Sequence, residues 1–132
     1  MSQEIEFLGR RTDMHVLYRN HNVLVMTSHY EGLPMVISEA FSFALPVIAY
    51  DCPTGPAEMI SNGENGFLID LYSKERFVEE IAKISLDAEL YSKLQYSALE
   101  ASSRWDAKKL CTLFYNKLKS IINDKNDIRR IS

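Results

Sequence analysis

The fold is decided by one stretch of the chain, residues 23–50, which reads VLVMTSHYEGLPMVISEAFSFALPVIAY. It opens with the apolar run Val23–Met26 and closes with a second run that begins at Pro46. Short apolar runs bounded by polar or turn-forming residues are typical of strands that are buried on both faces. Between the runs, Pro34 suits the first turn of a helix, whereas Pro46 cannot continue one. The stretch therefore predicts a strand, a helix that ends near Phe43, and a second strand.

The flanking sequence extends this alternation of strands and helices. Upstream, Ile5–Leu8 predicts a short strand ended by Gly9. Thr12 is a candidate cap for a helix whose apolar face includes Met14, Leu17 and Tyr18. Downstream, a loop rich in Pro and Gly leads to a short helix and to a strand over residues 67–69. Three more helices are predicted, over residues 73–85, from residue 87, and over residues 106–122. The pattern predicts an α/β fold, a Rossmann-like parallel sheet of about four strands flanked by helices.

Composition narrows the class of protein. The chain has 132 residues, 46% of them hydrophobic and 25% charged, which suits one globular domain. Its formal net charge of -3 argues against a nucleic-acid partner. Cys52 and Cys111 lie too far apart in sequence to suggest a disulfide framework or a zinc site. No run approaches the roughly 18 apolar residues that a membrane span needs. We therefore expect a cytoplasmic protein, with a domain over residues 1–122 and a polar tail over 123–132 that frays.

The chemistry is expected in the segment between the first buried strand and its helix, EGLPMVISE at residues 31–39. Open α/β sheets bind ligands at such strand ends. Gly32 lets a ligand approach the backbone, and the free N–H groups of the helix's first turn favour phosphate oxygens. The Glu31 carboxylate is suited to accept hydrogen bonds from sugar hydroxyls, and Glu39 is placed to reach a ribose diol. The segment predicts a site for an anionic, sugar-containing ligand.

This ordered set of residues resembles the glycosyl transferases group 1 family, whose members are retaining enzymes of the two-domain GT-B architecture. The family signature is two glutamates separated by seven residues, after a strand that ends in serine. The residues that match it are Ser28, Glu31, Gly32, Leu33, Pro34, Ser38, Glu39 and Ala40. The resemblance continues through the runs at 46–49, 55–60 and 62–68. It covers about residues 5 to 120, the second half of the family's C-terminal, donor-binding domain.

The resemblance implies transfer of a sugar from a nucleotide diphosphate sugar to an acceptor, with retention, in polysaccharide or glycan biosynthesis. It implies that Glu31 contacts the donor sugar as the catalytic residue and that Glu39 binds the ribose. It implies no cofactor and no essential metal. The remaining donor-binding candidates are Gly32, Leu33, Pro34 and Met35 in the turn, Gly55 beside the phosphates, and Arg10 near the base. Gly55 as a plain loop glycine and Arg10 as a solvated side chain remain alternatives.

The family pattern also implies parts that this sequence does not contain. Two further strands carry the basic residues that stabilise the leaving diphosphate, and an N-terminal domain binds the glycan or lipid-linked acceptor. We therefore expect little activity from this chain alone, and membrane association only in a full-length enzyme. The Ile5–Leu8 strand would lack its usual neighbours. It is predicted either to add to the exposed edge of the Val23–Met26 strand or to pair with another chain in a homo-oligomer.

A different class of function remains open. A truncated, non-catalytic module that binds nucleotide sugar weakly, or only mediates association, predicts the same fold without turnover. The donor base (UDP, GDP or ADP) and the acceptor are also open. A dehydrogenase is disfavoured because no GxGxxG motif follows a strand. The histidines share no metal-ligand spacing. Five aromatic residues at roughly helical spacing are predicted to pack in the core: Tyr91, Tyr96, Trp105, Phe114 and Tyr115.

Overall fold

The computed structural model describes residues 5–128 of the chain, and the side chains of residues 5–123. Helices and strands alternate through the first half, and helices alone make up the second. The elements follow in the order α1 (Met14–Asn20), β1 (Leu24–Met26), α2 (Met35–Ser42), β2 (Val47–Tyr50), α3 (Pro56–Met59), β3 (Gly66–Ile69), α4 (Lys74–Leu86), α5 (Ala88–Ser102), a short 3-10 turn (Ser103–Trp105) and α6 (Ala107–Ile128).

The strands form one parallel sheet with the order β1-β2-β3. Val25 pairs with Ile48 in the register of β1 and β2, and Ile48 pairs with Phe67 in that of β2 and β3. Parallel strands need crossover connections, which α2 and α3 supply here. The predicted fold class, a parallel Rossmann-like sheet flanked by helices, is confirmed. The described sheet has three strands, one fewer than predicted.

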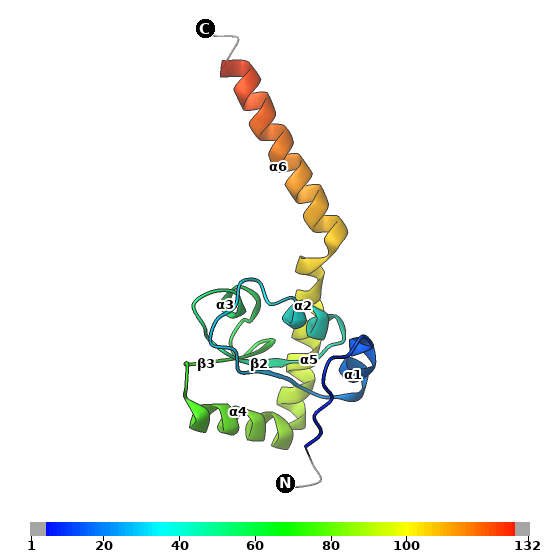
Figure 1. Ribbon diagram of the computed structural model, residues 1–132, viewed down its shortest axis with the longest axis vertical. Coiled ribbons are helices and arrows are strands. Elements are labelled where there is room, and N and C mark those ends of the chain that lie inside the picture. Colours follow the sequence, from blue (N-terminus) through cyan, green and yellow to red (C-terminus); the bar gives the residue numbers. More distant parts are fainter. Residues whose placement is uncertain (1–4, 129–132) are drawn as a thin grey trace.

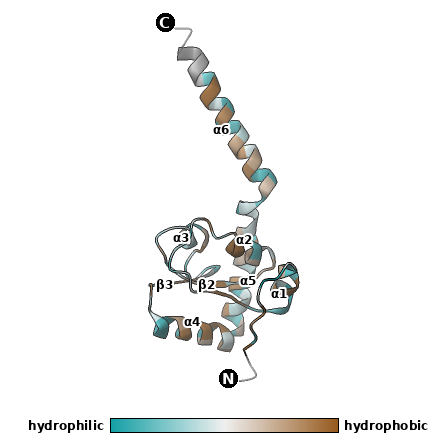
Figure 2. Ribbon diagram, viewed as in Figure 1, coloured by the Kyte–Doolittle hydropathy of each residue, from teal (hydrophilic) through white to brown (hydrophobic). Residues whose placement is uncertain are grey.

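Helices cover both faces of the sheet (Figure 1). α2 and α3 lie on one face, α4 lies on the other, and α5 contacts both α2 and α4. Tyr91 of α5 donates a hydrogen bond to Asn22, just before β1, so α5 lies near the edge at which the strands begin. Buried apolar residues of the strands and helices form two core clusters. Figure 2 colours the hydrophobic residues of these elements brown. The loops that follow the strands lie at the opposite edge, where the strands end.

Ile5–Leu8 is not a strand in the structure, so this prediction was wrong. The segment is irregular, and β1 pairs only with β2 in the described sheet. Phe7 is 87% exposed, and Ile5 is exposed as well. A strand needs a neighbour whose N–H and C=O groups face its own, and no strand of the described sheet pairs with this segment. Pairing with a second chain stays a prediction.

β1 is less buried than its apolar sequence predicts. Val25 is 45% exposed, whereas every residue of β2 is buried. Val25 shares its sheet face with Ile48, because it is the register partner of Ile48. That face is covered by α4, which contacts β2 and β3 and leaves β1 at the edge. The prediction that both faces of β1 are buried was therefore wrong at Val25.

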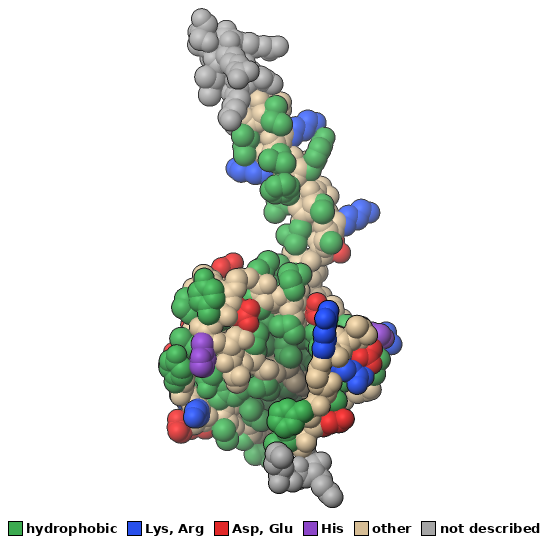
Figure 3. Space-filling view, in the orientation of Figure 1, with side chains coloured by type: hydrophobic (Ala, Val, Ile, Leu, Met, Phe, Trp, Pro, Cys, Tyr) green, Lys and Arg blue, Asp and Glu red, His purple; other side chains and the backbone are tan. Residues whose placement is uncertain are grey.

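α6 extends away from the rest of the molecule, which contradicts the predicted core packing of several aromatic residues (Figure 1). Tyr96 on α5, and Phe114 and Tyr115 on α6, are exposed. Figure 3 shows apolar side chains along the projecting helix. Because the main contacts of α6 within the described residues are with the short 3-10 turn, its apolar face has no core to pack against. Trp105 does pack against the core cluster, and Tyr91 packs partly buried beside the second cluster.

Helix boundaries agree with the cap residues seen in the sequence, with two differences. Asp87 and Asp106 cap α5 and α6, accepting hydrogen bonds from the N–H groups of Leu90 and Lys109 at 2.9 Å. α1, however, has Asp13 rather than Thr12 at its cap position. α6 continues through Ile128, so the tail predicted from residue 123 is helical as far as the structure describes it. No helix in this described part combines the length and hydropathy needed to cross a membrane.

Candidate functional site

Three loops meet at the edge of the sheet where the parallel strands end. Residues 27–34 follow β1, residues 51–55 follow β2, and residues 70–73 follow β3. We call these loops, together with α2, the strand-end cluster. The loop after β2 is tied to the end of β3 by a hydrogen bond from the N–H of Asp51 to the carbonyl of Ile69 at 2.7 Å. This is the edge at which open α/β sheets bind ligands. The predicted site residues Glu31–Met35 and Gly55 all lie on these loops or at the helix starts that follow them.

Gly55 packs directly against the turn that contains Gly32 and Pro34. A Cβ atom added at Gly55 would lie 2.5 Å from Cδ of Pro34 and 2.6 Å from the carbonyl oxygen of Gly32. The φ angle of Gly55 is +94°, a conformation that side-chain-bearing residues rarely adopt. The hydroxyl of Thr54 also donates to the carbonyl oxygen of Glu31. The loop after β2 thus fixes the turn before α2, and only glycine fits at the point of contact.

His29 links the loops after β1 and β3. Its ring lies edge-on to Tyr72, with 4.8 Å between ring centroids, and 6.2 Å from the ring centroid of Tyr50. The neighbouring Tyr30 is exposed. The spacing of the histidines predicted no metal site, and in the structure His29 lies in aromatic contacts between loops.

The first turn of α2 is open at its exposed end. The N–H of Ile37 bonds to the carbonyl of Pro34 at 2.9 Å, which begins the helix. The N–H groups before it belong to the first turn of the helix, and such groups have no hydrogen-bond acceptor within the helix. Gly32, Leu33 and Met35 are exposed beside these groups, while Pro34 is buried. The turn therefore offers N–H donors and the positive end of a helix dipole to an anion.

Glu39 is held by a residue that the sequence placed only on an apolar helix face. The hydroxyl of Tyr18, on α1, donates to Oε2 of Glu39 at 2.8 Å. Burial raises the pKa of Tyr18, and the hydrogen bond to Glu39 and its negative charge raise this pKa further. The phenol therefore stays neutral and keeps its proton available to the carboxylate. One carboxylate oxygen of Glu39 is used in this way.

We expect Tyr18→Phe to change how stability depends on pH. The unfolded chain ionises Tyr18 near pH ~10, whereas the raised pKa keeps it protonated when folded. The stabilising contribution of Tyr18 is therefore complete below about pH 10 and is lost as pH rises further, by about 1.4 kcal/mol per pH unit. Urea unfolding at pH 8 and pH 11 should show the wild-type advantage over Tyr18→Phe, about 1 kcal/mol at pH 8, shrinking or reversing at pH 11. An advantage of equal size at both pH values would contradict this.

Arg10 is not part of the strand-end cluster in the structure. Arg10 is exposed in the segment before α1, while its neighbour Arg11 pairs with Asp13, lowering the pKa of that carboxyl through a hydrogen bond. Arg10 therefore remains a candidate for the base only by prediction. In the described part of the chain, no three His, Cys, Asp or Glu side chains gather as a metal-binding group would.

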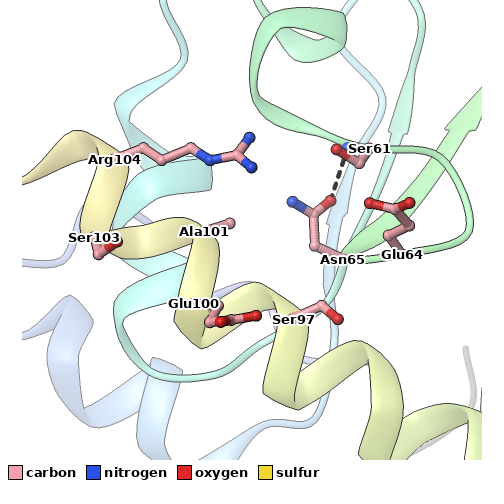
Figure 4. A pocket seen from close by; sticks show the side chains of 8 residues that line it. All are labelled: Ser61, Glu64, Asn65, Ser97, Glu100, Ala101, Ser103 and Arg104. Atoms are coloured by element: carbon pink, nitrogen blue, oxygen red, sulfur yellow. Dashed lines mark hydrogen bonds between the residues drawn. The ribbon is translucent and has the colours of Figure 1, made fainter.

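A polar pocket of about 300 Å³ lies at the other edge of the sheet, between the loop before β3 and the end of α5 (Figure 4). Its buried Asn65 accepts from the N–H of Ser61 at 2.9 Å and donates to the carbonyl of Met59 at 3.3 Å. Asn65 thus holds its own loop together. None of the site residues predicted from the sequence lines this pocket. We therefore take the strand-end cluster as the candidate site.

Two contributors to the site were missed from the sequence, Tyr18 and Thr54. A signal existed for Tyr18, because a buried tyrosine hydroxyl needs a hydrogen-bond partner and Tyr18 was predicted to face the core. Thr54 gave no signal, because its contact with the Glu31 backbone spans 23 residues and depends on how two loops meet.

The sequence matches one protein family and several curated relatives. The model of the family described as glycosyl transferases group 1 matches residues 1–101. The amylovoran biosynthesis glycosyltransferase AmsD of Erwinia amylovora is 33% identical over 123 residues, covering 93% of this chain and 33% of that protein. An uncharacterized glycosyltransferase of Haemophilus influenzae is 27% identical, covering 83% of this chain and 31% of that protein. The chain spans about a third of the length of these relatives.

Solved structures give the same result for the fold. Anabaena Alr3699/HepE, determined in complex with UDP-glucose, has a TM-score of 0.81 and 27% identity, covering 89% of this chain and 33% of that chain. The C-terminal domain of a glycosyl transferase group 1 family protein, LpcC from Francisella tularensis, has a TM-score of 0.66 and 25% identity, covering 76% of this chain and 51% of that chain. The predicted fold class, the Rossmann-like α/β fold of GT-B glycosyltransferases, is confirmed.

Proposed function

Because the chain belongs to the glycosyl transferases group 1 family, we propose that it forms the nucleotide-sugar-binding part of a retaining glycosyltransferase of glycan biosynthesis. The observation that carries the proposal is the strand-end cluster. There Gly55 packs against the turn before α2, which carries Glu31. Further along α2, Glu39 accepts a hydrogen bond from Tyr18. Each part of this cluster suits one part of a nucleotide diphosphate sugar.

The diphosphate suits the first turn of α2. Its N–H groups and helix dipole attract anionic oxygens, and Gly32 has no atom within 4 Å of where a Cβ would stand. A phosphate can therefore approach the backbone there without a side chain in the way. We propose that the backbone of Gly32, Leu33 and Met35 binds the diphosphate or the sugar, with Pro34 setting the direction of the turn. Gly55 acts by holding this turn.

The two glutamates suit the two polyol ends of the donor. Glu31 lies in the turn itself, where its carboxylate would accept hydrogen bonds from the hydroxyls of the transferred sugar at the reacting end. Glu39 lies further along α2, where it would accept from the ribose diol. In this proposal the sugar is transferred with retention at the anomeric carbon, and the diphosphate is stabilised by backbone N–H groups without a metal.

We propose a UDP-sugar as the donor. This rests on the likeness to Alr3699/HepE, which was solved with UDP and with UDP-glucose. The relative AmsD is named for amylovoran biosynthesis, which supports a polysaccharide or another glycan as the product. The acceptor would then be a glycan or a lipid-linked glycan, bound by an N-terminal domain of the whole enzyme.

The alternative is a module that binds nucleotide sugar weakly or only associates with a partner. The exposed apolar side chains of α6 favour it, since such surfaces are typical of association sites. This alternative keeps the fold and predicts no turnover. Donor binding is the property that separates an association module from a donor site.

Glu39→Ala is expected to weaken binding of UDP and UDP-glucose about 10- to 100-fold, the effect of losing a hydrogen bond to a charged group. Glu39→Gln should fall between wild type and Glu39→Ala, because its amide oxygen still accepts hydrogen bonds but carries no charge. Isothermal titration of the chain with UDP, UDP-glucose and GDP measures these affinities. GDP is expected to bind more weakly than UDP.

The matched control is Glu89→Ala, which removes an exposed glutamate on α5, away from the strand-end cluster. Its affinity for UDP should equal that of wild type. No saturable binding of UDP or UDP-glucose to the wild-type chain at millimolar ligand would contradict the donor site and favour the association module.

A further inference from the structure

Tyr18 joins α1 to the middle of α2 through a single hydrogen bond. Its ring is 4% exposed and belongs to the main core cluster, where it lies 5.5 Å from the ring of Phe43. Only its hydroxyl reaches outward, to Oε2 of Glu39. Since the ring is held by packing, the position of the hydroxyl is fixed by the core.

Glu39 is otherwise a side chain with considerable freedom. It is exposed, and a glutamate has three rotatable side-chain bonds, so holding it in one conformer costs entropy. A hydrogen bond from a fixed phenol selects the conformers in which Oε2 lies at the Tyr18 hydroxyl. The carboxylate is thus ordered before any ligand arrives, which lowers the entropy lost on binding.

The contact leaves the carboxylate able to bind a second group. A carboxylate has about four acceptor positions, and Tyr18 occupies one of them on Oε2. Two neighbouring hydroxyls, as in a ribose, can still donate to the remaining positions. Because Tyr18 stays neutral, it donates its proton to Oε2 and places no second negative charge beside the carboxylate.

From this geometry we infer that Tyr18 is a positioning residue, which orients the Glu39 carboxylate to receive the ribose diol of the nucleotide. The inference rests on the proposed donor site, and it adds a residue of α1, outside the segment 31–39, to the groups that set affinity for a ribonucleotide. It assigns Tyr18 a role in binding rather than only in the core.

Tyr18→Phe tests this, because it keeps the ring and removes the hydroxyl. We expect affinity for UDP to fall about three- to tenfold, measured by isothermal titration at pH 8. For 2′-deoxy-UDP, which lacks one hydroxyl of the diol, Tyr18→Phe should cost less affinity than it does for UDP. A loss of equal size for both nucleotides would mean that Tyr18 acts only through the fold, and it would overturn the inference.

Two further variants complete the test. Tyr91→Phe removes another tyrosine hydroxyl that donates a hydrogen bond, to Asn22 at the opposite edge of the sheet, and should leave UDP affinity unchanged. Tyr18→Phe added to Glu39→Ala should cost no further affinity, since the two act as one unit. If Glu39→Ala weakens UDP binding and Tyr18→Phe does not, the inference fails and the donor site stands. If wild type binds no UDP, the proposed function itself fails.

Discussion

Phe41→Ala is expected to lower the free energy of unfolding by about 3–5 kcal/mol, a large share of the roughly 5–15 kcal/mol that holds such domains folded. Phe41 is 0% exposed and lies in the core cluster between α2 and the sheet. Its loss leaves a cavity under the helix that carries Glu39. Urea unfolding followed by circular dichroism measures the effect. UDP binding by the variant should also fall in proportion to the fraction of molecules that is unfolded.

The matched control is Phe114→Ala on α6. Phe114 is 67% exposed, so its removal leaves no cavity, and alanine favours the helix more than phenylalanine does. Its stability should lie within about 0.5 kcal/mol of wild type. If both variants lost similar stability, Phe114 would be buried against something in solution. A loss below about 1 kcal/mol for Phe41→Ala would contradict the core described here.

Gly55→Ala is expected to lower affinity for UDP-glucose more than tenfold and to lower the free energy of unfolding by about 1–3 kcal/mol. The new methyl group would stand 2.5 Å from Pro34 and 2.6 Å from the Gly32 carbonyl, so the loop and the turn must move apart. A displacement of ~1 Å at a positioned site is enough for losses of this order or larger. Isothermal titration with UDP-glucose gives the affinity.

Gly63→Ala separates the clash from backbone strain. Gly63 also has a positive φ, +79°, but no atom lies within 4 Å of where its Cβ would stand. This variant should lose about 1–2 kcal/mol of stability through strain alone and keep its affinity. Equal affinity losses in the two variants would show that the contact between Gly55 and the turn does not set the donor site.

The local sequence correctly predicted several strands and helix starts. Two apolar runs predicted β1 and β2, and two prolines predicted the bounds of α2. These predictions succeeded because buried strands and helix starts depend on patterns within a few residues. The aspartates at 87 and 106 likewise fixed two helix starts. Where an apolar segment had no other element to pack against, the prediction from its pattern was wrong. Ile5–Leu8 has the composition of a strand, and Phe114 and Tyr115 have helical spacing, yet in the structure these residues are exposed.

The candidate site divides in the same way. The spacing of Glu31 and Glu39, with Gly32 and Pro34 between them, could be recognised from sequence, because the segment is continuous and the strand before it determines which edge of the sheet it occupies. The contacts of Gly55 with the turn and of Tyr18 with Glu39 could not. Each joins residues about 20 apart in sequence, and the distance between them depends on how the elements pack.

The sequence by itself determined the alternation of strands and helices, the parallel sheet, the family resemblance and the segment that carries both glutamates. These follow from short-range rules of burial, turn geometry and residue spacing. Only the tertiary structure decided which apolar surfaces are covered and what holds the site in place. Covering a face or fixing a carboxylate requires a partner brought near by folding, and neither the presence nor the position of that partner is written in the local sequence.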